Sequence, residues 1–184
     1  MAKEIRRQLQ EAAEKHQFTH IERGIPGGDE IEGFVLGVTP AWTVIAECDR
    51  LALDGFVALR TRDIVQLRRR GSGDLMVRWL QRHGPWPPPE PRGELSLTDV
   101  RSLTESVGRR YRLIAVFQED LDPGVCYIGA PVHFGKKRIE LREVNPRARW
   151  ATTPSSFRYE DITRIDFDDR YNTILDALAG PPPQ

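Results

Sequence analysis

Apolar and polar residues follow two different periods along the chain, one typical of helices and one typical of short strands. Ile5, Leu9 and Ala12 recur at helical spacing, which predicts an amphipathic helix over residues 3–16. Short apolar runs separated by turn residues come next and predict β-strands. Five strands are expected, at residues 18–22, 31–38, 43–48, 56–60 and 64–68, with a tight turn at Asp54-Gly55. A helix over residues 74–83 is expected to follow them.

The same succession of elements is expected a second time in the rest of the chain. Val100, Leu103 and Val107 form the apolar face of a helix that ends at Gly108, with Ser96 expected as its N-terminal cap. Strands are then expected at residues 112–118, 126–134, 138–144, 155–159 and 162–167. A last helix over residues 169–178 is expected to end at Gly180, because glycine suits a helix C-terminus.

A short motif occurs once in each half and relates the two sets of elements. Residues 59–67 read Leu-Arg-Thr-Arg-Asp-Ile-Val-Gln-Leu, and residues 157–165 read Phe-Arg-Tyr-Glu-Asp-Ile-Thr-Arg-Ile. Upstream of the motif, residues 33–38 match residues 129–134, and residues 44–48 match residues 140–144. Several matches in the same order predict a duplicated domain. Asp63 and Asp161 are expected to have a structural role, accepting backbone N–H bonds in a turn that both halves share.

Prolines divide the chain between the two sets of elements. Residues 84–93 read Gly-Pro-Trp-Pro-Pro-Pro-Glu-Pro-Arg-Gly. Proline fixes φ and lacks a backbone donor, so this segment is predicted to be a stiff, extended linker. The expected organisation is a first domain at residues 1–83, the linker at 84–93, a second domain at 94–180 and a tail at 181–184.

Charge and cysteine content narrow the classes of function. The chain has 27 basic and 27 acidic residues, so bulk attraction to nucleic acid or to an anionic membrane has no support. Cys48 and Cys126 do not occupy matching positions, and two unmatched cysteines do not indicate a disulfide framework or a metal site. No apolar run has the length of a signal peptide or of a membrane span. We therefore expect a cytoplasmic protein that does not bind membranes.

Residues that could carry chemistry are few. His16 and His20 are the only histidines close to each other in the sequence, and they straddle the predicted end of a helix, so a metal site is not expected. No serine or cysteine has the flanking pattern of a catalytic nucleophile. The acid pairs Glu160-Asp161 and Asp168-Asp169 are interpreted as solvated loop and helix-start charges. We expect no cofactor and no enzymatic activity.

Arginines form the remaining candidate site. Single-stranded nucleic acid is held by phosphate pairing and by base stacking on aromatic side chains. The arginines that could act in this way are Arg60, Arg62, Arg68, Arg69, Arg70 and Arg158. The alternative is a solvated rim of charges paired with nearby acids, and the zero net charge favours that alternative.

The arrangement resembles the Sm-like fold, a member of the SH3-like group of small barrels. The resemblance rests on the leading helix, on Gly33 and Gly129 in the second strand of each half, and on third strands that end near Glu47 and Glu143. It rests also on a fourth strand that runs almost directly into a fifth, across residues 60–63 or 158–161. The resemblance implies a mainly β protein of the α+β class, with two homologous five-stranded barrels that each have a leading and a trailing helix.

The resemblance also implies ring assembly and RNA binding in a pocket made by two loops. In this chain residues 39–42 read Thr-Pro-Ala-Trp and residues 134–137 read Phe-Gly-Lys-Lys, where Sm-like proteins supply an Asp and an Asn. Only Arg60 and Arg158 match the pattern of the second loop. The leading hypothesis is therefore a non-catalytic tandem interaction or assembly module that binds a protein partner or itself, using Trp42, Trp86 and Trp150. The alternative is an RNA-binding Sm-like protein.

Overall fold

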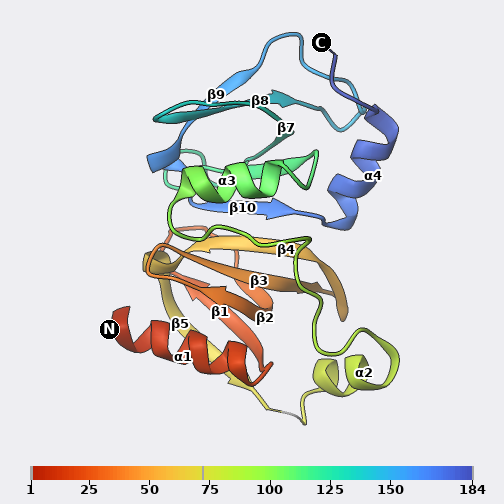
Figure 1. The fold of residues 1–184 in the computed structure, drawn as a ribbon. Helices are drawn as coiled ribbons and strands as arrows, with labels where there is room; N and C mark the ends of the chain where they lie inside the picture. The colour runs from red at the N-terminus through yellow and green to blue at the C-terminus, as the bar shows by residue number, and fades with distance from the viewer. Residues whose placement is uncertain (1, 72, 184) are drawn as a thin grey trace.

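The structure, a computed structural model that describes residues 2–71 and 73–183, is a mixed α+β fold built on one open antiparallel sheet (Figure 1). The residues 181–183 of the expected tail are described, and Gln184 lies outside the described residues. The first half comprises α1 (Ala2–Glu14), β1 (Phe18–Arg23), β2 (Ile31–Val38), β3 (Trp42–Asp49), β4 (Ala52–Arg60), the 3₁₀ turn η1 (Thr61–Asp63), β5 (Ile64–Arg70) and α2 (Leu75–His83). The second half comprises α3 (Val100–Gly108), β6 (Ile114–Phe117), β7 (Cys126–Phe134), β8 (Arg138–Glu143), β9 (Ser155–Arg158), η2 (Tyr159–Asp161), β10 (Arg164–Phe167) and α4 (Arg170–Ala179).

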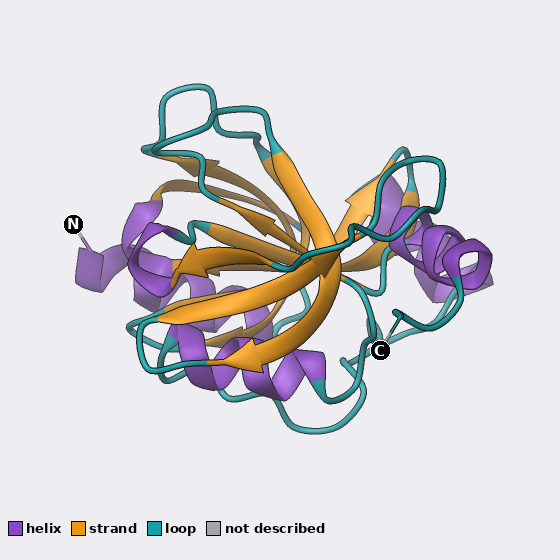
Figure 2. Cartoon of the chain, turned by 90° about the horizontal axis from the view of Figure 1, so that it is seen from above, coloured by secondary structure: helices purple, strands orange, loops and turns teal. Residues whose placement is uncertain are grey.

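The ten strands lie in the order β5-β1-β2-β3-β4-β10-β6-β7-β8-β9. Within each half the order is fifth, first, second, third, fourth, and the antiparallel pair β4–β10 joins the halves. The two closed five-stranded barrels that we expected are not confirmed, because the sheet is open. The physical reason is that β4 uses its outer edge to pair with β10 of the other half. Seen from above, the strands of this sheet cross at large angles, as in a strongly twisted sheet (Figure 2).

The repeated motif adopts the same local structure in both halves. In each copy a 3₁₀ turn separates the fourth strand from the fifth, and the residue after the turn donates its N–H back to the first residue of the turn. We expected Asp63 to accept a backbone N–H in this turn. In the structure its carboxylate accepts a hydrogen bond of 2.5 Å from Nε of Arg60, and its backbone carbonyl accepts the N–H of Gly24.

The turn between β3 and β4 differs from the sequence prediction. The tight turn was expected at Asp54-Gly55, but the chain turns at Arg50 and Leu51, whose φ angles are 46° and 67°. Gly55 lies within β4, has a φ of 74°, and faces the backbone of Asp169 so closely that a Cβ atom would collide with it. Glycine is needed at position 55 because the backbone of the second half comes so close to the strand. The turn itself is formed by Arg50 and Leu51.

Aspartates begin three of the helices. Asp74, Asp99 and Asp169 accept backbone N–H bonds at the N-termini of α2, α3 and α4, which satisfies donors that a helix leaves unpaired. Asp99 therefore caps α3, where Ser96 was expected. Gly180 ends α4 with a φ of 67°, as predicted. Within the described residues, no helix combines the length and the apolar character needed to cross a membrane.

Both halves contribute side chains to the largest hydrophobic cluster. Phe56 of the first half stacks on Phe167 of the second at 5.4 Å, and Tyr111 lies 5.0 Å from the same ring. A second cluster lies between α1 and the sheet of the first half. Trp86 of the linker packs edge-on against Phe34, with ring centroids 5.9 Å apart. The linker is thus part of the packed structure, and it crosses the first half on its way from α2 to α3 (Figure 1).

Candidate functional site

The boundary between the halves, here called the seam, places β4 against β10. The register runs from Arg164 opposite Leu59 to Phe167 opposite Phe56. Charged side chains gather around the start of β10, and all except the exposed Asp120 are buried or partly buried. They are Arg23, Arg60, Asp63, Glu119, Asp120, Arg164 and Asp166. Charges inside a protein are tolerated when they are paired and hydrogen-bonded, so the pairing at the seam decides what this region can do.

The most deeply buried pair joins Arg23 of β1 to Glu119, which follows β6. Their side chains are 0% and 5% exposed, and the guanidinium donates two hydrogen bonds of 2.5 and 2.6 Å to the carboxylate. The hydroxyl of Thr163 donates a third bond to Glu119 at 2.6 Å. Burial opposes the charge on Glu119, but the bonds from Arg23 and Thr163 outweigh it and hold its pKa below the ordinary value.

Arg60 and Arg158 stand at matching positions of the repeated motif, in different surroundings. Arg60 is 10% exposed and binds the carboxylates of Asp63 and Asp120 at 2.5 Å each. The Asp120 contact crosses the seam. Arg158 is 56% exposed and contacts Glu160 and Asp161 of its own half, the latter at 3.9 Å. The same motif therefore supplies a seam contact in one copy and a surface residue in the other.

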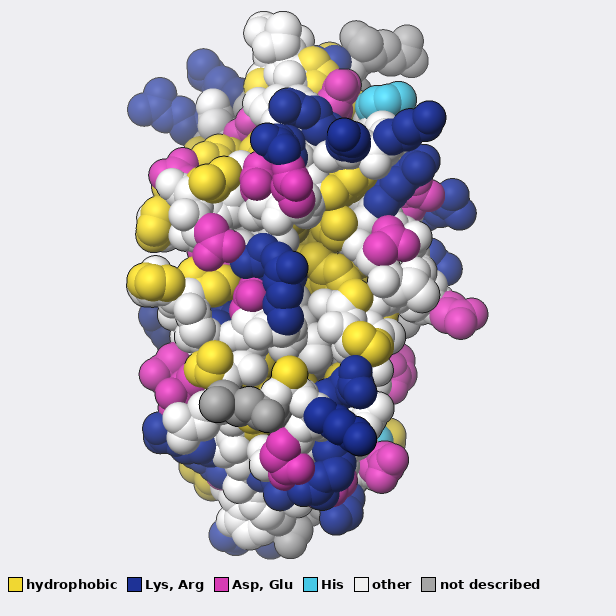
Figure 3. Space-filling model, turned by 90° about the vertical axis from the view of Figure 1, so that its left-hand side faces the viewer, with side chains coloured by type: hydrophobic (Ala, Val, Ile, Leu, Met, Phe, Trp, Pro, Cys, Tyr) yellow, Lys and Arg dark blue, Asp and Glu magenta, His cyan; other side chains and the backbone are white. Residues whose placement is uncertain are grey.

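The four remaining candidate arginines also contact carboxylates. Arg68 lies 2.6 Å from Glu22, Arg69 lies 2.9 Å from Glu11, and Arg70 lies 3.5 Å from Glu32. Arg62 lies 3.8 Å from Asp63. Figure 3 shows both basic and acidic side chains interspersed over one face of the molecule. The six arginines do not converge on one site, because three lie on β5, two lie at the seam and one lies at the end of β9.

A pocket of about 320 Å³ lies beside Arg60 and Arg62 at the seam. Pro40, Ala41 and Trp42 form one wall, and the start of α3 and η2 of the second half form the other. These include the two loops that the Sm-like resemblance assigns to RNA binding. Trp42 is only 3% exposed, so its ring faces are covered by protein and are not free to stack on a base.

A larger pocket of about 450 Å³ opens where β3 and β4 meet β10. Its acidic lining residues are Glu30, Glu32, Glu47, Asp49, Asp54, Asp166 and Asp169, and Cys48 and Arg50 complete the lining. We call it the acidic pocket. Burial, together with the nearby charge of Asp166, raises the pKa of Glu47 to about 7. Burial also raises the pKa of Asp166 to about 6, against the opposing effect of Arg164, whose guanidinium bonds it at 2.7 and 2.6 Å.

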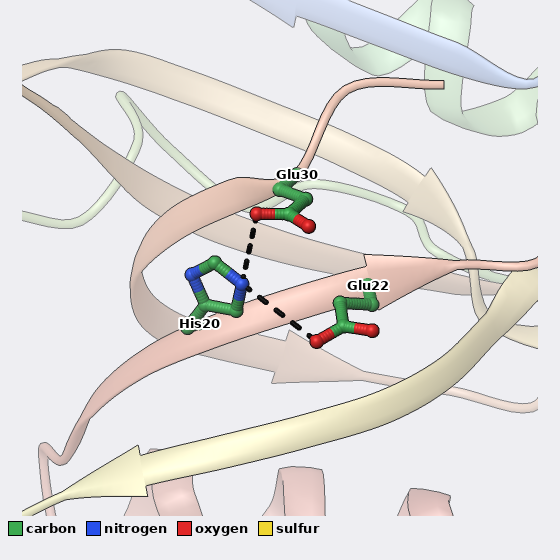
Figure 4. A group of neighbouring side chains, drawn as sticks. All are labelled: His20, Glu22 and Glu30. Carbon is green, nitrogen blue, oxygen red and sulfur yellow. Dashed lines mark ion pairs between the residues drawn. The ribbon is translucent and has the colours of Figure 1, made fainter. Parts of the chain in front are cut away.

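One cluster near the acidic pocket has side chains suited to a metal ion, and Figure 4 shows it. Nε2 of His20 lies 3.1 Å from Glu30 and 3.9 Å from Glu22, and Nδ1 lies 3.2 Å from Glu32. Among the described residues, His20, Glu22 and Glu30 form a group whose ligand atoms all lie within 4.8 Å of one another. The sequence prediction considered only His16 as a partner of His20. A signal for the cluster was present in the sequence. His20 and Glu22 alternate on one predicted strand, and Glu30 and Glu32 alternate at the start of the next.

The two ends of the strand order leave backbone edges open. β5 and β9 each have one strand neighbour within the described part of the chain. An open edge presents unpaired N–H and C=O groups, which can pair with another strand. The two free cysteines do not form a site together, because Cys48 is buried in the first half and Cys126 is exposed in the second.

Comparison with family models, with curated proteins and with solved structures gives no match to this chain. The resemblance to Sm-like proteins therefore stays a prediction from the sequence. What the chain can do is argued from its own geometry, in which the seam, the open edges and the cluster around His20 are the candidate sites.

Proposed function

We propose that the chain is a non-catalytic interaction module that associates with further copies of itself through the free edges of β5 and β9. The observation that carries the proposal is the β4–β10 pair. Both halves have the same strand order, so β9 stands in the second half where β4 stands in the first. In the same way β5 stands where β10 does. A second copy that placed its β5 beside β9 would repeat the seam between chains.

Backbone groups at β9 are suited to such pairing. The N–H of Tyr159 donates to the carbonyl of Lys137 on the β8 side. Since backbone groups alternate in direction along a strand, Phe157 also faces β8 and Ser156 faces outward. The matching residue of the first half is Ala58, which lies opposite Ile165 of β10. Ser156 therefore offers an outward N–H and C=O where the first half uses Ala58 to bind its neighbour.

Charges along β5 bear on the proposal. Three arginines in a row are typical of edges that resist association. In this chain each of the three contacts a carboxylate of its own half, so the edge is not a bare row of positive charge. A β5–β9 contact is head-to-tail, and contacts of this type close into a ring or continue into a filament.

Ser156→Pro tests the proposal, because proline removes the outward N–H and costs no hydrogen bond to β8. We expect the wild-type chain to sediment as species larger than one chain at rising concentration, and Ser156→Pro to sediment as a monomer. Ser156→Ala is the matched control, since it keeps the N–H, and it is expected to behave as wild type. A wild-type chain that stays monomeric at high concentration contradicts the proposal, and so does a Ser156→Pro variant that assembles normally.

Binding of single-stranded RNA at the pocket beside Arg62 is a second proposal with less support. The position of that pocket, between the two loops named by the resemblance, favours it. The carboxylate contacts of every candidate arginine and the covered rings of Trp42 oppose it. The absorbance ratio of the same preparations, made at low and at high salt and treated with ribonuclease, tests it, because RNA bound through phosphates is lost as salt rises.

A further inference from the structure

Two neighbouring strands bring four side chains of the first half together on one face. His20 and Glu22 are two residues apart on β1, and side chains at that spacing point to the same face of a strand. Glu32 lies opposite His20 in the β1–β2 register, and Glu30 stands just before β2. β1 is paired on both sides, with β2 and with β5. The backbone that carries His20 and Glu22 is therefore held rigidly.

The ring of His20 is oriented by Glu32. Its Nδ1 lies 3.2 Å from a Glu32 oxygen, and Arg70 lies 3.5 Å from that same carboxylate. When Nδ1–H donates to Glu32, the lone pair of Nε2 is left free. Figure 4 shows Glu22 and Glu30 both on the Nε2 side of the ring. Metal-binding histidines are commonly held in this way, with the second ring nitrogen donating to a carboxylate.

Two of the three separations between the ligand atoms fit a single ion as they stand. Two atoms that each lie about 2.1 Å from a metal are at most about 4.2 Å apart. The distances from Nε2 to Glu30 and to Glu22 are 3.1 and 3.9 Å. The three ligand atoms all lie within 4.8 Å of one another. The Glu30 side chain is 64% exposed, so it is free to rotate and to bring its oxygen within about 4.2 Å of the Glu22 oxygen.

The surroundings of the cluster favour binding of a cation, although Arg68 competes with an ion for Glu22. Glu30 and Glu32 also line the acidic pocket, and a cleft lined by one sign of charge raises the local concentration of the opposite ion. Arg68 contacts the same oxygen of Glu22 that faces His20, at 2.6 Å. Its side chain is 63% exposed and is free to move into solvent. Arg68 therefore competes with an ion for Glu22 and does not close the site.

From these contacts we propose that His20, Glu22 and Glu30 bind one divalent transition-metal ion, with Glu32 orienting the imidazole. One imidazole nitrogen and two carboxylate oxygens suit zinc or manganese, whereas magnesium and calcium prefer oxygen ligands alone. The site faces solvent, so water fills the remaining positions on the ion. The proposal does not depend on how the chain assembles.

Isothermal titration of the full chain, first treated with a chelator and then dialysed, tests the proposal with zinc chloride and, separately, with magnesium chloride. We expect one zinc ion per chain and much weaker binding of magnesium. His20→Gln is expected to weaken zinc binding by at least about tenfold, as losses around a metal site do. Arg68→Ala is expected to strengthen it. His133→Gln, which changes an exposed strand histidine on β7, is the matched control and should leave zinc binding unchanged.

Glu30→Gln is a second variant that separates binding from folding, because the Glu30 side chain is largely exposed. It is expected to keep the wild-type circular dichroism spectrum and to weaken zinc binding, and zinc should raise the melting temperature of wild type more than that of either weakened variant. Two results overturn the proposal. One is a wild-type chain with no saturable zinc binding, and the other is equal zinc affinity in wild type, His20→Gln and Glu30→Gln. Either would show that the cluster is a network of ion pairs only.

Discussion

Arg60 and Arg158 are the second residues of the repeated motif in the two halves, yet they lie in different surroundings. Both are followed by a 3₁₀ turn of three residues that returns the chain into the next strand. Arg60 is enclosed at the seam by Asp63 and by Asp120 of the other half. Arg158 lies at the free edge of the sheet, against acids of its own turn. The motif thus determines the local backbone, and the neighbouring half determines what its arginine binds.

The pair Arg23 and Glu119 shows the same dependence on the neighbouring half. The register places Thr19 of β1 opposite Gly33, and it places Ile114 of β6 opposite the matching Gly129, so Arg23 corresponds to Gln118 and not to Glu119. The side chains of Arg23 and Glu119 bind each other across the seam. Residues at non-matching positions therefore hold the halves together at this point.

Removing Arg23 is expected to lower the unfolding free energy more than any other change considered for the seam. Arg23→Ala leaves Glu119 buried without its partner, which typically costs about 3 to 5 kcal/mol of unfolding free energy. Urea denaturation followed by circular dichroism measures the loss. The double variant Arg23→Met with Glu119→Leu removes both charges and is expected to recover most of the stability. A double variant as unstable as Arg23→Ala would show that shape at this position matters more than charge.

The two motif arginines are expected to differ when each is truncated. Arg60→Ala removes charge-assisted hydrogen bonds from a nearly enclosed site, and it is expected to lower the unfolding free energy by about 2 to 3 kcal/mol. Arg158→Ala removes an exposed ion pair and is expected to change the unfolding free energy by less than about 0.5 kcal/mol. The same denaturation experiment compares them. Equal losses would contradict the distinction between seam and edge.

A smaller effect on the unfolding free energy is expected from the ionisation of Glu47, which faces the second half near the end of β3. Its folded-state pKa of about 7 lies above its ordinary value of 4.5, because of burial and of the charges of Asp166, Asp54 and Asp169, against the opposing effect of Arg164. The ionised carboxylate is therefore a cost that is present above pH 7 and is removed as the pH falls through 7 toward 4.5.

Glu47→Gln is accordingly expected to be more stable than wild type at alkaline pH, by about 1 to 2 kcal/mol, and to lose that advantage as the pH falls below neutrality. Urea denaturation over a series of pH values measures the difference. Glu143→Gln changes the matching residue of the second half and is expected to leave the wild-type pH dependence in place. A Glu47→Gln variant with the same pH dependence as wild type would contradict the assignment.

Local sequence patterns were sufficient to predict most of the elements, because strands and helices are set by neighbours along the chain. The strand at residues 126–134 has the predicted bounds, and the helix that ends at Gly180 has the predicted terminus. The turn at Arg50-Leu51 was missed, since two non-glycine residues adopt positive φ there and Gly55 offered a stronger turn signal. That glycine is explained by Asp169, 114 positions away.

The contacts of the candidate site residues depend on partners far away in the sequence. Glu11 reaches Arg69 across 58 positions, and Asp120 reaches Arg60 across 60. The sequence offered the alternative that the arginines are paired with nearby acids, but it did not identify these acids. The open sheet was missed for a related reason, because strand order alone does not say whether β4 will pair within its own half or with its neighbour.

The Pro-rich linker has a consequence for how the polypeptide is threaded. The linker leaves α2 of the first half and leads, through residues 94–99, to α3 of the second half. Proline fixes φ, so this segment has few backbone conformations open to it. Trp86 also packs against Phe34 of β2. The path of the chain between the halves is thus set by the surface of the first half, and this restricts where α3 can start.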